Sequence, residues 1–154
     1  MCSSDLLGQI CKTTRGQFIN GKTKSRRRVQ KVVIGAMNSG HAMEFFKPGT
    51  LIITPGDRED VILAALSSST LSENDGHSIA GLVLSGDLVP NSPIMELLKN
   101  SEVPTIASPL DSYTVASSIH SMTVKTLPGD VEKIDKIQTM VERYVEVDRL
   151  LGKL

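Results

Sequence analysis

The chain has 154 residues, with 17 Lys and Arg against 17 Asp and Glu, so its formal net charge is zero. Hydrophobic residues make up 40% and charged residues 22%, which suits a chain that buries the core of one domain and excludes a disordered one. The zero net charge and an aromatic content of 3% argue against a dedicated nucleic-acid-binding domain, which is usually basic and offers stacking surfaces.

Targeting and metal-binding signals are missing from the sequence. No apolar run approaches the 18 residues of a membrane span, and residues 1–14 lack the basic start and apolar stretch of a secretory signal. The two cysteines, Cys2 and Cys11, are too few for a disulfide framework, and no His lies at zinc-ligand spacing from them. We therefore expect a cytoplasmic protein that has no membrane partner, no metal and no cofactor.

Four short apolar runs predict buried strands. Each run is continuous rather than alternating and is rich in Val and Ile, which is typical of parallel strands covered on both faces. The runs comprise residues 32–36, 51–54, 80–84 and 103–107.

Segments with helical spacing separate these strands and follow the last one. Helical spacing predicts helices over residues 39–46, 58–68 and 93–100. A further helix is expected to run through His120. In the first helix, Ala42, Phe45 and Phe46 are expected on one side. The alternation of strands and helices predicts an α/β domain.

The residues between the apolar segments predict where helices begin. Asp57 precedes one predicted helix and Ser92 precedes a proline at the start of another, so both are expected N-caps. Asp111 or Ser112 caps the next helix. The stretch 67–77 is rich in Ser, Asn, Asp and Gly and is expected to be the main flexible loop.

A long C-terminal helix is predicted over residues 130–150, which at 1.5 Å per residue spans about 30 Å. Its apolar stripe consists of Ile134, Ile137, Val141, Tyr144 and Leu151. Residues 1–31 are expected to be a lead-in of one helix and short strands that belongs to the same domain as residues 32–154.

Residues 16–23 match the phosphate-loop pattern GxxxxGK[ST]. A true phosphate loop follows a buried strand and opens a helix, whereas polar residues precede this match and a basic run follows it. Phe18 and Ile19 instead predict a short strand that ends in a turn at Asn20 and Gly21. A small NTPase that uses this segment is kept as an alternative.

Six of the ten residues from 22 to 31 are basic. Such a run can contact phosphate, a nucleotide or a nucleic acid. A solvated loop and edge strand, protected from aggregation by their charge, is the favoured interpretation because the surrounding sequence offers no stacking aromatic residue beyond Phe18.

The carboxyl ends of the predicted strands carry small and polar residues. In open α/β sheets, ligands bind outside these ends, next to helix N-termini. We expect a small anionic metabolite or nucleotide here, with aspartates for ribose or amine groups and Arg58 for phosphate or carboxylate. The candidate ligand-binding residues are Thr54, Gly56, Asp57, Arg58, Ser85, Gly86, Asp111 and Thr114.

The sequence gives little support for catalysis. It contains no GxSxG motif, and His41, His77 and His120 have no spacing that suggests a triad. Asp57, Glu59 and Asp60 lie in one predicted helix start, where their charges repel. No catalytic residue is assigned, and the expected role is not enzymatic.

Five segments, taken in order, resemble the DRTGG domain family, in particular the middle domain of long bacterial phosphotransacetylases. The segments are residues 33–37, 47–60, 81–87, 111–116 and 128–151. The stretch Gly56 to Asp60 is the most specific. The contiguous sequence Asp-Arg-Thr-Gly-Gly, from which the family takes its name, is absent. Asp87 also stands where the resemblance leads us to expect a second glycine after Gly86.

The resemblance implies a Rossmann-like α/β fold with a mostly parallel sheet flanked by helices, a homodimer and a regulatory role. We expect no acetyl transfer, because none of the 154 residues is left to form an acetyltransferase domain. The leading hypothesis is a non-catalytic regulatory and dimerisation domain. The alternatives are a fragment or relative of a phosphate acetyltransferase without its catalytic domain, the small NTPase, and a pure assembly module that pairs through its C-terminal helix.

Overall fold

A computed structural model describes residues 5–71, 79–122 and 139. The chain divides into two units, residues 1–122 and 123–154. The expected helix at 130–150 and its apolar stripe lie outside the described residues, and so does His77. The assignment of residues 32–154 to one domain stays a prediction.

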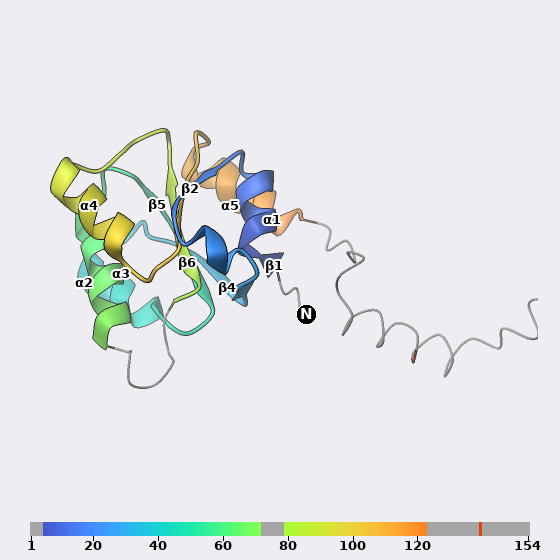
Figure 1. The fold of residues 1–154 in the computed structure, drawn as a ribbon, viewed down its shortest axis with the longest axis horizontal. Helices are drawn as coiled ribbons and strands as arrows, with labels where there is room; N and C mark the ends of the chain where they lie inside the picture. The colour runs from blue at the N-terminus through green and yellow to red at the C-terminus, as the bar shows by residue number, and fades with distance from the viewer. Residues whose placement is uncertain (1–4, 72–78, 123–138, 140–154) are drawn as a thin grey trace, which may run out of the picture. The chain divides into compact units, whose positions relative to one another are not determined.

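A five-stranded sheet forms the centre of the first unit (Figure 1). Its order is β2-β7-β6-β5-β4, and the last four strands are parallel. The strands are β2 (Gln17–Asn20), β4 (Lys31–Ile34), β5 (Thr50–Pro55), β6 (Gly81–Ser85) and β7 (Thr105–Ala107). β2 pairs with β7 in the antiparallel direction, and a separate pair joins β1 (Asp5–Leu6) to β3 (Arg28–Val29). The predicted α/β fold with a mostly parallel sheet is confirmed.

Helices cover both faces of the sheet. One layer holds α2 (Ser39–Ala42), α3 (Glu59–Leu71) and α4 (Ser92–Asn100), and the other holds α1 (Leu7–Thr13) and α5 (Ser112–His120). The connections from β4 to β5, β5 to β6 and β6 to β7 all move in the same direction across the sheet. Because such connections share one handedness, α2, α3 and α4 lie on the same face.

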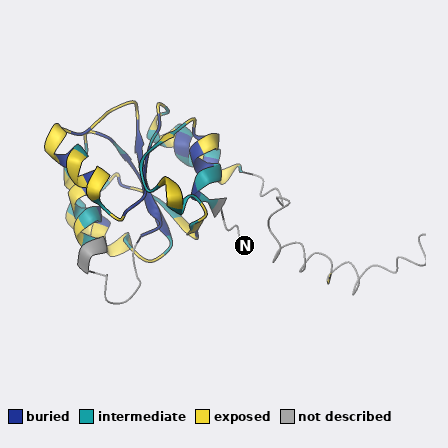
Figure 2. Cartoon of the chain, viewed as in Figure 1, coloured by how far each residue is buried: buried dark blue, intermediate teal, exposed yellow. Residues whose placement is uncertain are grey.

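The core lies on both sides of the central strands β5 and β6, which are buried except for Pro55 at the end of β5 (Figure 2). Successive side chains of β5 alternate between the faces. Leu51 and Ile53 pack in the layer of α1 and α5, whereas Ile52 packs with α3 and α4. A strand that must be apolar on both faces cannot show a polar alternation, which is why its sequence is a continuous apolar run.

The apolar run at 32–36 is an edge strand rather than a doubly buried one. β4 has a single neighbour, β5, among the described strands, and Ile34 is 39% exposed. Composition alone predicts an extended segment and cannot tell an edge from a centre, because that difference depends on which strands pair.

Several predicted boundaries are wrong by a few residues. The segment 39–46 is α2 followed by a 3-10 turn at Met43–Phe45, which leaves Phe45 36% exposed while Ala42 is buried. α3 continues to Leu71, into the expected loop. Within it, the hydroxyls of Ser67 and Ser68 donate to the helix carbonyls of Leu63 and Ala65.

Candidate functional site at the carboxyl ends of the strands

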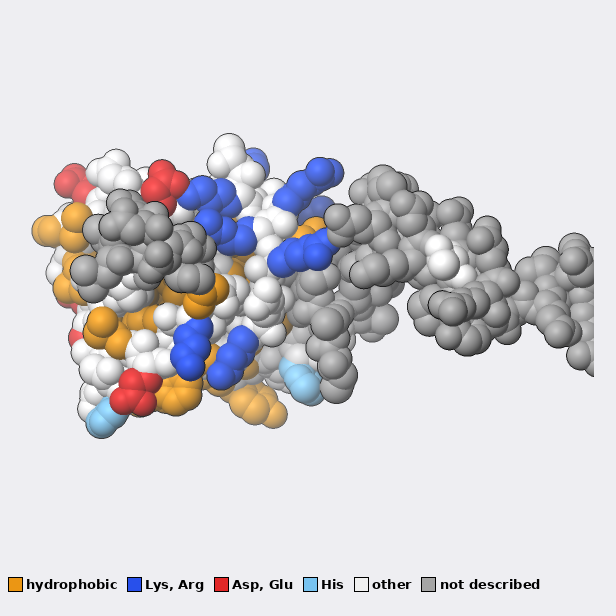
Figure 3. Space-filling view, turned by 90° about the horizontal axis from the view of Figure 1, so that it is seen from below, with side chains coloured by type: hydrophobic (Ala, Val, Ile, Leu, Met, Phe, Trp, Pro, Cys, Tyr) orange, Lys and Arg blue, Asp and Glu red, His pale blue; other side chains and the backbone are white. Residues whose placement is uncertain are grey.

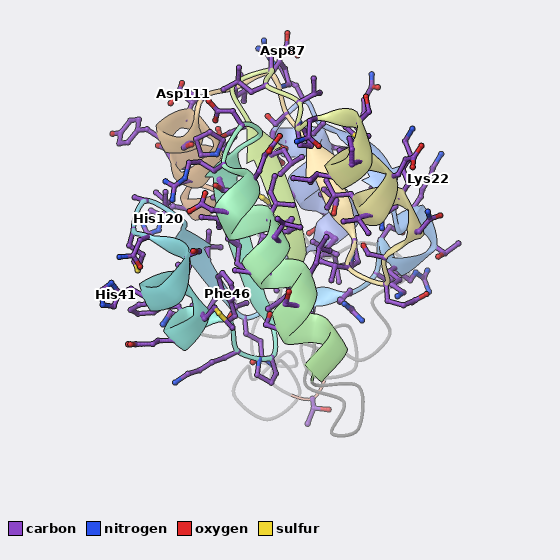
Figure 4. The ribbon with its side chains drawn as sticks, turned by 90° about the vertical axis from the view of Figure 1, so that its left-hand side faces the viewer. Lys22, His41, Phe46, Asp87, Asp111 and His120 are labelled. Carbon is purple, nitrogen blue, oxygen red and sulfur yellow. The ribbon has the colours of Figure 1, made fainter. Side chains whose placement is uncertain are left out.

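The parallel register brings the predicted site residues to one edge of the sheet. Thr54 pairs with Leu84 and Pro55 with Ser85, so the segments that follow β5 and β6 begin side by side. Asp87 and Asp111 lie at this same end of the molecule (Figure 4). We call it the carboxyl edge. The prediction that these segments meet at one edge is confirmed, whereas their role in binding a ligand stays a prediction.

Thr54 is the side chain at this edge that the fold leaves unsatisfied. It is fully buried, and its Oγ1 is the one buried side-chain polar atom without a hydrogen-bond partner among the described residues. A Cβ placed on Gly35 would lie 3.5 Å from the Thr54 Cβ, so the chain after β4 crosses close to it. A buried hydroxyl without a partner costs free energy, and such a group in a native fold calls for an explanation.

The two glycines serve the turns of the chain. A Cβ on Gly56 would lie 1.8 Å from the Leu88 carbonyl oxygen, so the backbone after β6 occupies the space that a ligand was expected to use. Gly86 has a φ of +84° and its N–H donates to the Leu110 carbonyl at 2.8 Å. Asp87 follows with a φ of +56°. Glycine is needed at 86 for its left-handed backbone, and its amide is already occupied.

Arg58 fastens the start of α3 to the loop after β4. Its Nε and Nη2 donate to the two Asp60 carboxylate oxygens at 2.9 and 3.0 Å, and Nη2 also donates to the Met37 carbonyl at 2.9 Å. The hydrogen bond from Arg58 lowers the pKa of Asp60 below its usual value. α3 begins at Glu59, so Arg58 rather than the expected cap Asp57 stands directly before the helix, and Asp57 is exposed.

Asp111 and Thr114 satisfy each other at the start of α5. The Asp111 carboxylate accepts from the Thr114 backbone N–H at 2.9 Å and from its hydroxyl at 2.5 Å, which confirms the predicted cap. These hydrogen bonds, the one from the hydroxyl foremost, lower the pKa of Asp111. Beside them, the hydroxyls of Ser85 and Ser112 lie 2.7 Å apart.

Sequence reasoning missed the contacts that join the start of α3 to the start of α4. Glu59 accepts from the Asn91 backbone N–H at 2.8 Å and from its side-chain amide at 2.9 Å. Asn91, not Ser92, is the N-cap of α4, and its side chain accepts from Ile94 N–H. The Asn-Ser-Pro order permits either cap, and only the position of Glu59 selects Asn91.

Four exposed carboxylates stand around the carboxyl edge. They belong to Asp57, Asp60, Asp87 and Asp111. Among the described residues, Asp60 is the one of the four that has an ion pair. These residues form no cluster that could hold a metal ion within the described part of the chain. The carboxylates suit hydroxyl or amine donors, and any anion would depend on Arg58.

The segment that matches the phosphate-loop pattern is a strand. Residues 17–20 form β2 and pair with β7, a helix precedes them instead of a strand, and a 3-10 turn at Lys22–Lys24 follows. Gly21 has a φ of +69°, as the predicted turn requires. The NTPase alternative therefore lacks the curled loop and the following helix that hold phosphate.

The other reactive side chains among the described residues do not converge. His41 and His120 are exposed on α2 and α5 and lie away from Asp87 and Asp111 (Figure 4). Cys11 is a buried free thiol, and burial raises its pKa, which keeps it protonated and unreactive.

Comparisons with known proteins agree with this architecture. The family model described as the DRTGG domain matches residues 9–122. A phosphate acetyltransferase of Pseudomonas aeruginosa is 33% identical over 87% of this chain and 19% of its own length. The Escherichia coli phosphate acetyltransferase is 29% identical over 85% of this chain and 18% of its own length. The chain thus spans about a fifth of the curated relatives it matches.

One solved structure supports the fold directly. It contains the CBS and DRTGG domains of the regulatory region of a Clostridium perfringens pyrophosphatase, complexed with the activator diadenosine tetraphosphate. Its TM-score is 0.60 at 25% identity, with 90% of this chain and 61% of that chain covered. In the described part of the chain, no helix has the length and apolar character needed to cross a membrane.

Proposed function

Because the chain belongs to the DRTGG domain family, we propose that it is a non-catalytic regulatory and dimerisation domain related to phosphotransacetylases, and that it binds a small anionic metabolite or nucleotide at the carboxyl edge. Family membership carries this proposal. Two observations support it: the relatives match over about a fifth of their length, and the described histidines and Cys11 form no catalytic constellation. The reducing cytoplasm remains the compartment we propose.

A nucleotide fits the mixed chemistry of the carboxyl edge better than a simple anion does. Ribose hydroxyls can donate to the exposed carboxylates of Asp57 and Asp111, and a phosphate can pair with Arg58 once Asp60 is displaced. The unsatisfied Thr54 hydroxyl supplies a donor that the fold itself does not use. The nucleotide activator of the pyrophosphatase regulatory region is of the same chemical class.

The test is thermal denaturation of the chain against adenine nucleotides, diadenosine tetraphosphate, acetyl phosphate, CoA, pyruvate and NAD(H), with and without magnesium. A ligand of the native state raises the Tm by mass action, by several degrees at about 100 times its Kd. We expect one compound to do so, and we expect Arg58→Ala to abolish the shift.

Thr54→Val separates binding from folding. Valine has nearly the shape of threonine, and the hydroxyl it removes has no partner, so this variant is expected to be as stable as the native chain or more so. It should nevertheless bind the ligand less tightly. Lys99→Ala, an exposed change on α4, is the matched control. A flat panel, or a shift that survives in both site variants, would refute the proposed site.

The dimerisation role is supported by the open edge of β4. The Lys31 N–H donates to the Gly49 carbonyl just before β5, and the Gly35 N–H donates to the Ile53 carbonyl of β5. The alternation of a strand therefore turns the N–H groups of Val32 and Ile34 away from the sheet. An edge of this kind, with Ile34 39% exposed, is able to pair with the same edge of a second copy.

A further inference from the structure

Topology forces residues 21–30 to cross the whole sheet. β2 ends where β7 begins, because Asn20 pairs with Thr105, whereas β4 starts at the opposite side of the sheet. The chain must therefore run along the amino-terminal ends of β7, β6 and β5. We call this segment the strap, and the end of the sheet that it crosses the amino edge.

Contacts along the strap fix it at each strand in turn. The Lys24 ammonium pairs with the carboxylate of Glu102, ahead of β7, and donates to its carbonyl at 2.8 Å. Arg27 Nη1 donates to the Ile79 carbonyl at 3.0 Å, ahead of β6. Gln30 N–H donates to the Gly49 carbonyl at 2.8 Å, ahead of β5. The strap is thus held in one conformation before any partner arrives.

The strap itself carries one sign of charge. Residues 21–30 contain five Lys and Arg and no Asp or Glu. Figure 3 looks onto the amino edge and shows the basic side chains gathered across it. We call the exposed basic side chains there the basic band: they are Lys22, Arg26, Arg28, Lys31 and Lys47.

Part of this charge is not used to hold the described fold. Lys24 and Arg27 anchor the strap. Lys31 lies on the edge strand β4, where a charge helps to prevent aggregation. This explanation does not apply to Lys22, Arg26 and Lys47, because they lie outside the strands. Within the described residues, these three have no ion pair. A row of like charges on a fixed segment repels itself unless an anionic surface neutralises it.

We propose that the basic band is a docking surface for an acidic protein surface, one on which several Asp and Glu side chains are displayed together. Single exposed ion pairs contribute little, so a small anion would gain little here, whereas a partner that meets several charges at once gains from all of them. A single-stranded nucleic acid would also stack its bases on exposed aromatic rings. The one exposed phenylalanine near the band, Phe45, already has the Lys31 ammonium 5.6 Å from its ring centre.

The test measures binding of the full chain to a fluorescent peptide of about twenty glutamates, by anisotropy. The double variant Lys22→Gln, Arg26→Gln should weaken binding about tenfold, and raising the salt should weaken the native chain in the same direction. Lys12→Gln, Arg15→Gln is the matched control, because it removes the same amount of charge at the opposite end of the sheet. These residues precede the start of β2, which pairs with the end of β7 at the carboxyl edge. It should leave the affinity within about twofold of the native value.

Three results would overturn this proposal. Equal loss in both double variants would mean a general charge effect. Tighter binding of tripolyphosphate or single-stranded RNA than of the glutamate peptide would assign the band to another partner. Self-association that the strap variant abolishes would mean that the partner is a second copy. The nucleotide test uses residues at the opposite end of the sheet, so the two proposals fail separately.

Discussion

The guanidinium of Arg58 donates to Asp60 and to the Met37 carbonyl, so a phosphate reaching the carboxyl edge must displace a bidentate carboxylate. Asp111 is likewise already in use, because its carboxylate oxygens accept hydrogen bonds from Thr114. At the scale of single residues, polar groups that suit a ligand by type also cap helices or join neighbouring segments. Thr54 differs from them, because its hydroxyl makes no hydrogen bond within the described fold.

Gly56→Ala is expected to destabilise the chain by about 3 kcal/mol, because the added methyl would meet the Leu88 carbonyl at 1.8 Å and the backbone would have to move. Urea denaturation measures the loss. Gly40→Ala is the control, since its Cβ would approach nothing closer than the Asn38 side chain at 3.5 Å. Equal stability of Gly56→Ala and the native chain would show that the turn after β6 does not press on Gly56.

Asp111 should contribute to stability only where it is ionised. Its pKa is lowered in the folded chain, so its contribution is present above the unfolded value of about 3.9 and disappears as the pH falls through the folded pKa. Asp111→Asn keeps a capping oxygen but does not titrate. The fall in Tm between pH 6 and pH 2.5 should therefore be smaller in this variant than in the native chain; an identical fall would contradict the assignment.

At the scale of elements, the starts of α3 and α4 stabilise each other through Glu59 and Asn91. The pair explains why α4 begins where it does, and it holds the covering turn between β6 and α4 in place over Gly56. The space beside Gly56 is consequently filled by the chain's own turn rather than left open for a ligand.

The N-cap of α4 can be tested by two neighbouring alanine substitutions. Asn91→Ala should cost about 1 to 2 kcal/mol, because it removes the cap to Ile94 and one hydrogen bond to Glu59. Ser92→Ala, which removes the cap predicted from sequence, should cost less than about 0.5 kcal/mol. Chemical denaturation measures the loss of stability in both variants. A larger loss in Ser92→Ala than in Asn91→Ala would show that Ser92 is the cap.

At the scale of the whole molecule, charge is distributed between the two ends of the sheet. The strap carries basic residues to the amino edge, and four exposed aspartates surround the carboxyl edge. One end therefore offers donors for an acidic partner, and the other offers acceptors for a ligand rich in hydroxyl groups. The proposed ligand site and the proposed docking surface therefore lie at opposite ends of the sheet.

The proposed dimer predicts a response to charge on β4. Ile34→Lys should shift sedimentation of the chain toward the monomer at a given concentration, because two facing lysines would repel across paired edges. Leu97→Lys, on the exposed side of α4, should leave the distribution unchanged. A native chain that stays monomeric over the whole concentration range would refute pairing through β4.

The sequence by itself determined the local elements. Continuous Val and Ile runs predicted β4 to β7, the Asn-Gly pair predicted the end of β2, and Asp111 was one of the two caps expected for α5. These features depend on neighbours within a few residues, where steric preference, periodicity and capping act. The resemblance added the family, which the match over residues 9–122 bears out.

Only the tertiary structure decided how these elements serve a site. Strand pairing joins residues that are far apart in sequence, so local patterns could not predict it. They did not show that β2 joins β7 at the far side of the sheet or that β4 is an edge. For the same reason they did not show that residues 21–30 form the strap. The commitment of Arg58 and the covering of Gly56 likewise depend on segments about 20 to 30 residues away in sequence. Contacts of that kind arise from packing the whole domain, which no pattern of neighbouring residues encodes.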